Sequence, residues 1–149
     1  MATPSWKASR DPLYRGDAGS QVQLPAPAAD PSLVRHILYL GGRGRLSPYL
    51  SLSESREVAQ RFAGREGRIY RSRVPRWPAL AVAHRSRSDL VQLLRGQGKG
   101  EAAWPSAFEV MQARRYVEEN AEHLADFRAL ADAAEPTLRG VVDQVFDEG

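Results

Sequence analysis

Residues 49–74 carry the pattern that most limits how this chain can fold. Apolar and polar residues alternate over Tyr49–Ser53, as they do along a strand with one buried face. Residues 54–63 then keep their apolar side chains on one helical face until Gly64 ends the helix, and Arg68–Val74 alternates again. A strand that leads directly into a helix and then into a second strand predicts a fold that mixes both kinds of element.

The rest of the chain divides into short elements and a helical end. We expect short strands at residues 13–15 and 79–83 and helices at residues 32–40 and 89–95. The polar, proline-containing residues 1–12 are expected to be flexible. From 106 to 146 the apolar residues keep helical spacing, which predicts a helical C-terminal elaboration. With 42% hydrophobic residues, the 149 positions are enough for one core, so we expect a single α+β domain over residues 1–149.

The charges are divided unevenly along the chain. The first 99 residues contain 17 basic and 7 acidic side chains, whereas residues 100–149 contain 4 basic and 11 acidic ones. The net charge of +10 in the first segment favours contact with an anion such as a phosphate group. Nineteen of the 21 basic residues are arginine, whose planar guanidinium suits phosphate.

Composition disfavours several kinds of site. The chain has no cysteine, so it forms no disulfide and holds no thiolate-bound metal or iron–sulfur cluster. Its histidines, His36, His84 and His123, lack the usual spacing of metal ligands, and we expect no metal. Residues 1–10 lack the apolar core of an export signal, and no apolar run approaches the roughly 20 residues of a membrane helix. We therefore expect a soluble chain with no signal peptide and no membrane contact.

Several sequence pieces occur in an order that matches a known enzyme superfamily. They are Leu13-Tyr14-Arg15-Gly16, the Ser51-x-Ser53 strand, the helix that follows it, and the strand from Gly67 to Val74. Together they resemble the ADP-ribosyltransferase superfamily, particularly the Arg/Ser/Glu branch that includes the cholera- and pertussis-type toxins. In that branch an arginine ends the first strand, a Ser-x-Ser strand precedes a helix, and a glutamate follows some tens of residues later. The resemblance covers roughly residues 11–75 and implies a small split sheet with flanking helices.

The resemblance implies a role for each matching residue, with NAD as co-substrate. Arg15, with Tyr14 and Gly16 beside it, is expected to hold the NAD pyrophosphate through its guanidinium. Ser51 and Ser53 share one face of a strand, so one hydroxyl can orient the ligand while the other positions a carboxylate. A glutamate near the ribose stabilises the positive charge that develops as the bond to nicotinamide breaks.

The sequence offers several candidates for the catalytic glutamate. In the family it lies in a Glu-x-Glu or Gln-x-Glu element that enters a strand. Glu101, 48 residues after Ser53 and followed by apolar residues, is the best positional match. Lys99 stands where the first Glu or Gln of that element normally engages an acceptor, which argues against a protein arginine as acceptor. The alternatives, in an expected helix, are Glu109, Glu118 and Glu119.

The expected function is transfer of ADP-ribose from NAD to a macromolecular acceptor, either a protein or an RNA. Tyr49 and Tyr70 are expected to stack on nicotinamide, and Trp77 to lie in a loop over the ligand. The resemblance to toxins also implies delivery into a target cytoplasm and a neutralising immunity or antitoxin protein. The sequence itself assigns neither the acceptor nor the compartment.

Other functions compete with this one. The same site would act as an NAD glycohydrolase if water were the acceptor. The RNA 2′-phosphotransferase branch has a similar strand–helix–strand segment, but Arg15 stands where that branch has a histidine. A different class of function is a non-catalytic module that binds RNA or protein through its basic face. Its sequence basis is the Arg-x-Arg pairs, which are Arg43/Arg45, Arg71/Arg73 and Arg85/Arg87.

Overall fold

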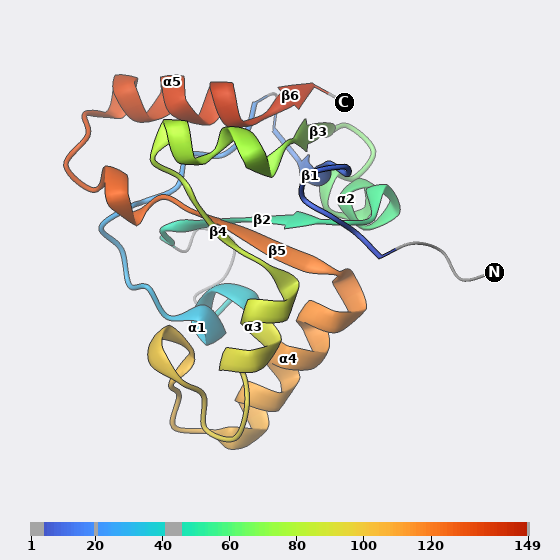
Figure 1. The fold of residues 1–149 in the computed structure, drawn as a ribbon, viewed down its shortest axis with the longest axis vertical. Helices are drawn as coiled ribbons and strands as arrows, with labels where there is room; N and C mark the ends of the chain where they lie inside the picture. Colours follow the sequence, from blue (N-terminus) through green and yellow to red (C-terminus); the bar gives the residue numbers. More distant parts are fainter. Residues whose placement is uncertain (1–4, 20, 41–45, 149) are drawn as a thin grey trace.

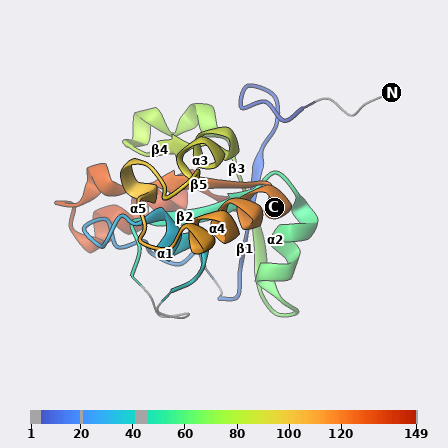
Figure 2. The same ribbon diagram turned by 90° about the horizontal axis from the view of Figure 1, so that it is seen from below.

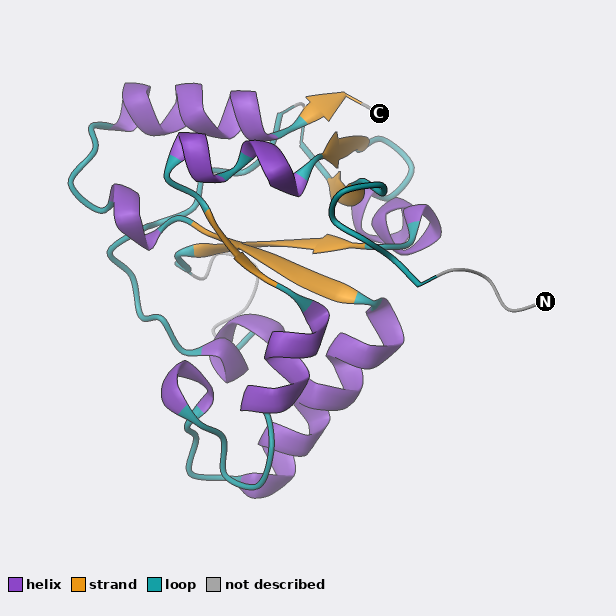
Figure 3. Ribbon diagram, viewed as in Figure 1, coloured by secondary structure: helices purple, strands orange, loops and turns teal. Residues whose placement is uncertain are grey.

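The computed structural model describes residues 5–19, 21–40 and 46–148 and has the expected α+β architecture (Figure 3). Its helices are α1 (Leu33–Ile37), α2 (Arg56–Ala63), α3 (Arg87–Leu93), α4 (Ala107–Asn120) and α5 (Glu135–Val145). Its strands are β1 (Leu13–Asp17), β2 (Tyr49–Ser53), β3 (Arg68–Ser72), β4 (Ala83–Arg85), β5 (Glu122–Asp126) and β6 (Asp147–Glu148). The Arg43/Arg45 pair lies outside the described residues.

The strands form one antiparallel sheet in the order β4-β5-β2-β1-β3-β6. β2 pairs with β5 over its whole length, and β1 pairs with β3 in the same way. Between β1 and β2 the described residues pair at one position, where Tyr14 stands opposite Ser53. The sheet therefore consists of two well-paired halves that separate on either side of this one link.

Helices cover the sheet on two faces (Figure 1). Leu50 and Leu52 of β2 belong to a core completed by α5. Tyr49, the neighbour of Leu50, belongs to a second core built with α1, α3 and α4. Because side chains alternate along a strand, Ser51 and Ser53 lie on the same face as Tyr49. The two serines are thus directed toward the side of the sheet that α1 and α4 cover.

Glycine allows α2 to approach β1 closely. A Cβ atom on Gly16 would lie 1.7 Å from the carbonyl oxygen of Ala59, and one on Gly67 would lie 2.0 Å from that of Ala63. The helix begins after Ser55, whose Oγ accepts a hydrogen bond from the Val58 N–H at 3.3 Å. Figure 2 shows α2, with β1 and β3, standing to one side of α1 and α4. This packing places α2 against the strand that carries Arg15.

The expectation of a largely helical C-terminal third is wrong at its centre. α4 ends at Asn120, Ala121 adopts a left-handed backbone with φ of 45°, and residues 122–126 form β5 between β4 and β2. Every residue of β5 is buried, so the strand shows no polar–apolar alternation that would distinguish it from a helix.

The short apolar run at 79–83 is also not a strand; a 3-10 turn, Pro78–Leu80, precedes β4.

The opening residues, which we expected to be flexible, are anchored where the structure describes them. The Trp6 Nε1–H donates to the carbonyl oxygen of Pro12 at 2.9 Å, and the Trp6 ring lies 4.5 Å from that of His123. Residues 1–4 of that expected segment lie outside the described part of the chain. In the described ranges, none of the helices combines the length and apolar character that a membrane span requires.

Candidate active site

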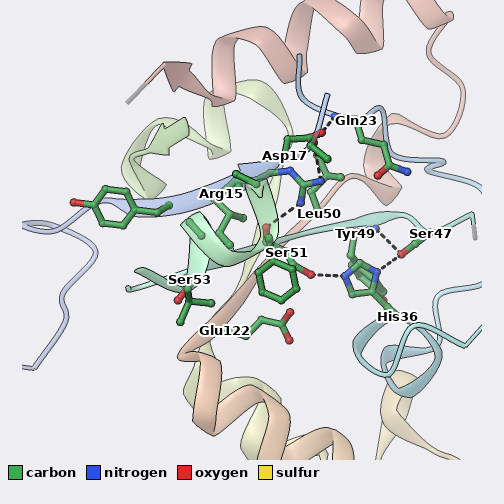
Figure 4. Close-up of a pocket in the computed structure, with 18 of the residues that line it drawn as sticks. Arg15, Asp17, Gln23, His36, Ser47, Tyr49, Leu50, Ser51, Ser53 and Glu122 are labelled. Carbon is green, nitrogen blue, oxygen red and sulfur yellow. Dashed lines mark hydrogen bonds and ion pairs between the residues drawn. The ribbon is translucent and has the colours of Figure 1, made fainter. Parts of the chain in front are cut away.

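A cavity of about 650 Å³ opens where β1 and β2 separate (Figure 4). Its volume lies within the range of roughly 300–1,000 Å³ that is typical of small-molecule sites. Polar side chains from three neighbouring strands line it, Asp17 of β1 among them, and α1 adds a histidine. They include Arg15 of β1, Ser51 and Ser53 of β2, Glu122 of β5 and His36 of α1.

Arg15 is fixed across the gap between the two halves of the sheet. Its Nη1 donates to the carbonyl oxygen of Ser51 at 3.0 Å, and its Nη2 donates to Oδ2 of Asp17 at 3.1 Å. The Arg15 Nε–H is buried and has no hydrogen-bond partner among the described residues. Leaving such a donor unsatisfied is unfavourable, and an anion in the cavity would satisfy it. The guanidinium therefore has the character of an anion-binding group held ready by two protein contacts.

Asp17 positions Arg15 and the loop that follows β1. Its carboxylate accepts hydrogen bonds from the Gly19 N–H at 3.2 Å and from the Gln23 N–H at 2.9 Å, besides the bond from Arg15. The Arg15 and Asp17 side chains are only 11% and 12% exposed, which makes this ion pair stronger than one on the open surface. The sequence analysis gave Asp17 no role, although it stands two residues after Arg15 on the same strand.

Ser51 is linked to a buried histidine. The His36 Nε2 atom lies 2.7 Å from Ser51 Oγ, and Nδ1 lies 2.6 Å from Ser47 Oγ. A neutral imidazole donates from one nitrogen and accepts at the other, so His36 fixes the directions of both hydroxyls. Ser51 thus holds Arg15 through its carbonyl group and faces His36 through its side chain. Sequence spacing could not reveal this pair, because its members are 15 residues apart and lie on different elements, α1 and β2.

Ser53 joins β2 to the end of α4. Its Oγ donates to the carbonyl oxygen of Asn120 at 2.5 Å and accepts the Ser55 N–H at 3.0 Å. The helix cap is Ser55, so Ser53 is not the N-cap of α2. In the β2–β5 register Ser53 stands opposite Glu122, two residues after Asn120. The buried hydroxyl of Ser53 therefore fixes the backbone that carries the Glu122 carboxyl group.

Glu122 is another site residue that sequence reasoning missed. It is 4% exposed and lines the same cavity as Arg15 and Ser51. The available signal was Asn120-Ala121-Glu122 at the entrance to a strand, where the family has Glu-x-Glu or Gln-x-Glu. We missed it because Ala121 and Leu124 fit the helical stripe that the sequence analysis extended through this region.

The structure does not bring Glu101 to the other predicted site residues. Glu101 lies in the 3-10 turn Gly100–Ala102, outside the cavity, and accepts from Arg85 at 2.8 Å and from Arg128 at 3.0 Å. A hydrogen bond from its own backbone N–H, together with these arginines, lowers the pKa of Glu101. Asp126 joins the same group through Arg128, at 2.7 Å. The Glu101 carboxyl group is therefore part of an ion-pair network that links β4 and β5 to the 3-10 turn.

The alternative glutamates also lie outside the cavity lining. Glu109 accepts a hydrogen bond from Trp104 Nε1 at 3.0 Å in the first turn of α4. Glu118 and Glu119 each stand one helical turn after an arginine on α4, with ion-pair distances of 4.0 Å. Such exposed pairs contribute little beyond helix stability. None of these three carboxyl groups is placed to act with Arg15.

The predicted aromatic contacts are only partly gathered at the cavity. Tyr14, Gly16 and Tyr49 line it, whereas Tyr70 and Trp77 are buried in the core on the α5 side. The Tyr49 hydroxyl donates to the Pro31 carbonyl at 2.8 Å, and its ring meets His36 edge-on at 5.6 Å. Burial raises the pKa of Tyr49 to about 12. Tyr49 therefore packs against the His36 ring, and because it is buried it presents little surface to a ligand.

The described residues include no group of three or more His, Asp or Glu side chains placed to hold a metal ion.

No protein-family model matches the chain, and no curated protein and no solved structure is significantly similar to it. The chemistry of the cavity is therefore the basis on which a function is assigned.

Proposed function

We propose that this chain is an NAD-dependent ADP-ribosyltransferase that cleaves the nicotinamide–ribose bond of NAD. The observation that carries the proposal is the meeting of Arg15, Ser51 with Ser53, and Glu122 in one cavity, each on a different neighbouring strand. This is the chain order of the Arg/Ser/Glu branch that the sequence resembles. The separation of β1 from β2 supports the further proposal that the sheet is of the split, ADP-ribosyltransferase-like kind.

Arg15 is proposed to bind the pyrophosphate of NAD. Its Nε–H, buried and without a protein acceptor, matches a phosphate oxygen, and charge-assisted hydrogen bonds of this kind are stronger than neutral ones. Asp17 and the Ser51 carbonyl hold the guanidinium in place before the ligand arrives. Because this orientation is already fixed, less conformational entropy is lost on binding.

Glu122 is proposed to stabilise the transition state. Bound NAD supplies the reacting bond, whose electron pair leaves with nicotinamide and leaves positive charge on the ribose. A carboxylate in a buried site stabilises such charge far more than water does, because little reorganisation is needed. Ser53 holds the Glu122 backbone, and the Ser51–His36 pair orients the hydroxyl that faces the ligand.

Hydrolysis of NAD is the second reaction that the same site supports. The residue two before Glu122 is Asn120, an amide, and its Nδ2 donates to the Tyr116 carbonyl at 3.1 Å. A carboxylate at this position would attract a cationic acceptor, and an amide does not. Water therefore reaches the ribose carbon without a competing charged group when no acceptor is bound.

The experiment that tests this proposal measures both binding and cleavage. NAD should raise the melting temperature of the purified chain, since a ligand that binds only the folded state stabilises it. Incubation should then release nicotinamide, with the ADP-ribose recovered either free or attached to a component of a cell lysate. If neither the melting temperature nor the NAD changes, the proposal is wrong; salt-dependent binding of RNA would then favour the non-catalytic binding module.

A further inference from the structure

Aromatic side chains stand at the rim of the cavity. The rings of Tyr39, which follows α1, and Phe62 of α2 are nearly parallel, with centroids 6.4 Å apart and an interplanar angle of 15°. Both residues line the cavity, as does Leu46, which is 72% exposed. Phe62 is 42% exposed, an unusual solvent exposure for a phenylalanine beside a buried polar site. The rim therefore offers a flat apolar face to whatever reaches the ribose from outside.

The charge at this rim is positive. Arg61, on α2 next to Phe62, is exposed, and its Nη2 lies 3.5 Å from the Asn120 amide oxygen. The carboxyl groups among the described cavity-lining residues are Asp17 and Glu122, and both are nearly buried inside it. A cationic acceptor such as an arginine side chain would meet Arg61 at the rim, while the carboxylates of the described cavity lining are buried. The rim is better matched to an acceptor that is flat and neutral or anionic.

From these two observations we propose that the acceptor is a base of a single-stranded nucleic acid. This inference rests on the proposed NAD chemistry and names the substrate class of the same site. Bases stack on exposed aromatic rings irrespective of sequence, and arginines beside such rings bind the phosphates. Tyr39 and Phe62 provide the stacking surface, and Arg61 provides the phosphate contact.

The rest of the α2 region extends the basic surface. Arg56 precedes Arg61 on the helix and Arg65 follows it, and both are exposed. Two glutamates lie among these arginines, Glu57 and Glu66, and a hydrogen bond from its own backbone N–H, together with the charge of Arg56, lowers the pKa of Glu57. Three exposed arginines against two glutamates leave residues 56–66 with a net positive charge next to the aromatic rim, which gives the nucleic acid backbone a path beyond the base. The excess of basic residues in the first 99 positions is consistent with this partner.

The transfer step conserves atoms and charge. A ring or amino nitrogen of the base forms a bond to the ribosyl carbon as the bond from that carbon to nicotinamide breaks. The bonding electron pair leaves with nicotinamide, which becomes neutral. An attacking nitrogen that carries a proton, whether in an amino group or in the ring, loses it to solvent; a ring nitrogen without a proton keeps the positive charge that nicotinamide gives up. Glu122 stabilises the charge on the ribose during this exchange and keeps its own protonation state.

The test separates NAD cleavage from acceptor choice. The full chain is incubated with NAD labelled in its adenylate phosphate and with one of three acceptors, which are a mixed-sequence single-stranded RNA, the corresponding DNA, and an arginine-rich polypeptide. Nicotinamide release is measured in every arm and without acceptor. We expect label on the RNA, the DNA or both, resistant to protease and sensitive to nuclease, and a yield that falls as salt rises.

Variants at the rim should change transfer more than cleavage. Phe62→Leu removes the stacking ring, and Arg61→Gln removes the rim cation, so each should lower the ratio of nucleic acid labelling to free ADP-ribose by about tenfold or more. The matched controls are Phe108→Leu and Arg115→Gln on α4. Phe108 is 63% exposed and the Arg115 side chain 69% exposed, and neither residue lines the cavity. These controls should keep the ratio of the unmodified chain.

The outcomes are distinguishable. Nicotinamide release with label on the polypeptide, or with free ADP-ribose in all three arms, would overturn the inference about the acceptor and leave the proposed NAD cleavage intact. Equal ratios for the rim variants and the α4 controls would also overturn it. If nicotinamide is released in no arm, the proposed function fails, and the inference fails with it.

Discussion

Ser53 of β2 stands directly opposite Glu122 of β5, in a pair of strands joined over their whole length. The Ser53 hydroxyl also donates to the carbonyl oxygen two residues before Glu122, at 2.5 Å. The strand register and this hydrogen bond therefore fix the position of the Glu122 backbone, and with it the position of the carboxyl group in the cavity. Because catalytic groups lose much of their effect when they shift by about 1 Å, this link has a measurable consequence.

Replacing Ser53 with alanine should lower activity as well as stability. The Ser53→Ala variant leaves the Asn120 carbonyl and the Ser55 N–H without this buried partner, which typically costs about 1–3 kcal/mol. We expect kcat for nicotinamide release to fall about tenfold or more, because the Glu122 backbone is less firmly placed. Ser88→Ala, at an exposed position on α3, is the control. An unchanged kcat in Ser53→Ala would show that this link does not position the carboxyl group.

Replacing Arg15 with lysine should weaken NAD binding despite the retained charge. Lysine has one ammonium group in place of the planar fork, so it cannot hold Ser51 and Asp17 and also bind an anion in the same way. We expect KM for NAD to rise by about tenfold or more and NAD to protect the variant less in a melting assay. Arg71→Lys, at an exposed position on β3, should leave both measurements unchanged.

Gly16 is expected to be a packing residue rather than a ligand contact. Gly16→Ala would place a Cβ atom 1.7 Å from the Ala59 carbonyl oxygen, so α2 must move away from β1. We expect a loss of about 1–3 kcal/mol in the free energy of unfolding and a melting temperature lower by several degrees. Gly140→Ala, in α5 with open space around it, should be neutral or stabilising by about 0.5–1 kcal/mol. Equal melting temperatures for the two variants would contradict this explanation.

Stability should decrease as the pH falls below neutrality. The rings of His84 and His123 are stacked at 5.1 Å, with His84 Nε2 2.8 Å from His123 Nδ1, and Glu54 contacts His123 at 2.8 Å. Burial lowers the pKa of both histidines to about 4. The unfolded chain takes up these protons near pH 6.5 and the folded chain only near pH 4, so stability present at pH 7 is lost as the pH falls between those values.

Urea denaturation at pH 7.0 and pH 5.0 measures this effect. The free energy of unfolding should be lower at pH 5.0, and the difference should shrink in His84→Gln, which removes one titrating group. A difference that is the same in this variant and in the unmodified chain would mean that other groups cause the pH dependence.

The sequence predicted those elements in which apolar residues recur with the spacing of a strand or a helix. The β2 strand coincides with the expected Tyr49–Ser53, and α2 and β3 fall within the expected 54–63 and 68–74. In β2 apolar and polar residues alternate although both faces are covered, and α2 keeps its buried side chains on one face, so the spacing of each element is visible in the sequence. The expected helix at 32–40 is confirmed in its central part as α1.

The sequence could not locate the carboxyl group of the site for a physical reason. β5 is buried on both faces and is preceded by a left-handed Ala121, so neither its period nor a glycine marks its start. Without that strand, no pattern distinguished Glu122 from the glutamates of α4. The pairing of His36 with Ser51 is a tertiary contact that no local pattern encodes.

The most direct test compares two glutamate variants for nicotinamide release from NAD. Glu122→Gln keeps the side-chain volume and removes the negative charge in the cavity, so we expect kcat to fall by about a hundredfold or more. Glu101→Gln removes a carboxylate that lies outside the cavity between Arg85 and Arg128. It should retain the kcat of the unmodified chain, with at most a modest loss of stability. Full activity in Glu122→Gln, or its loss in a folded Glu101→Gln variant, would contradict the assignment of Glu122 as the catalytic carboxylate.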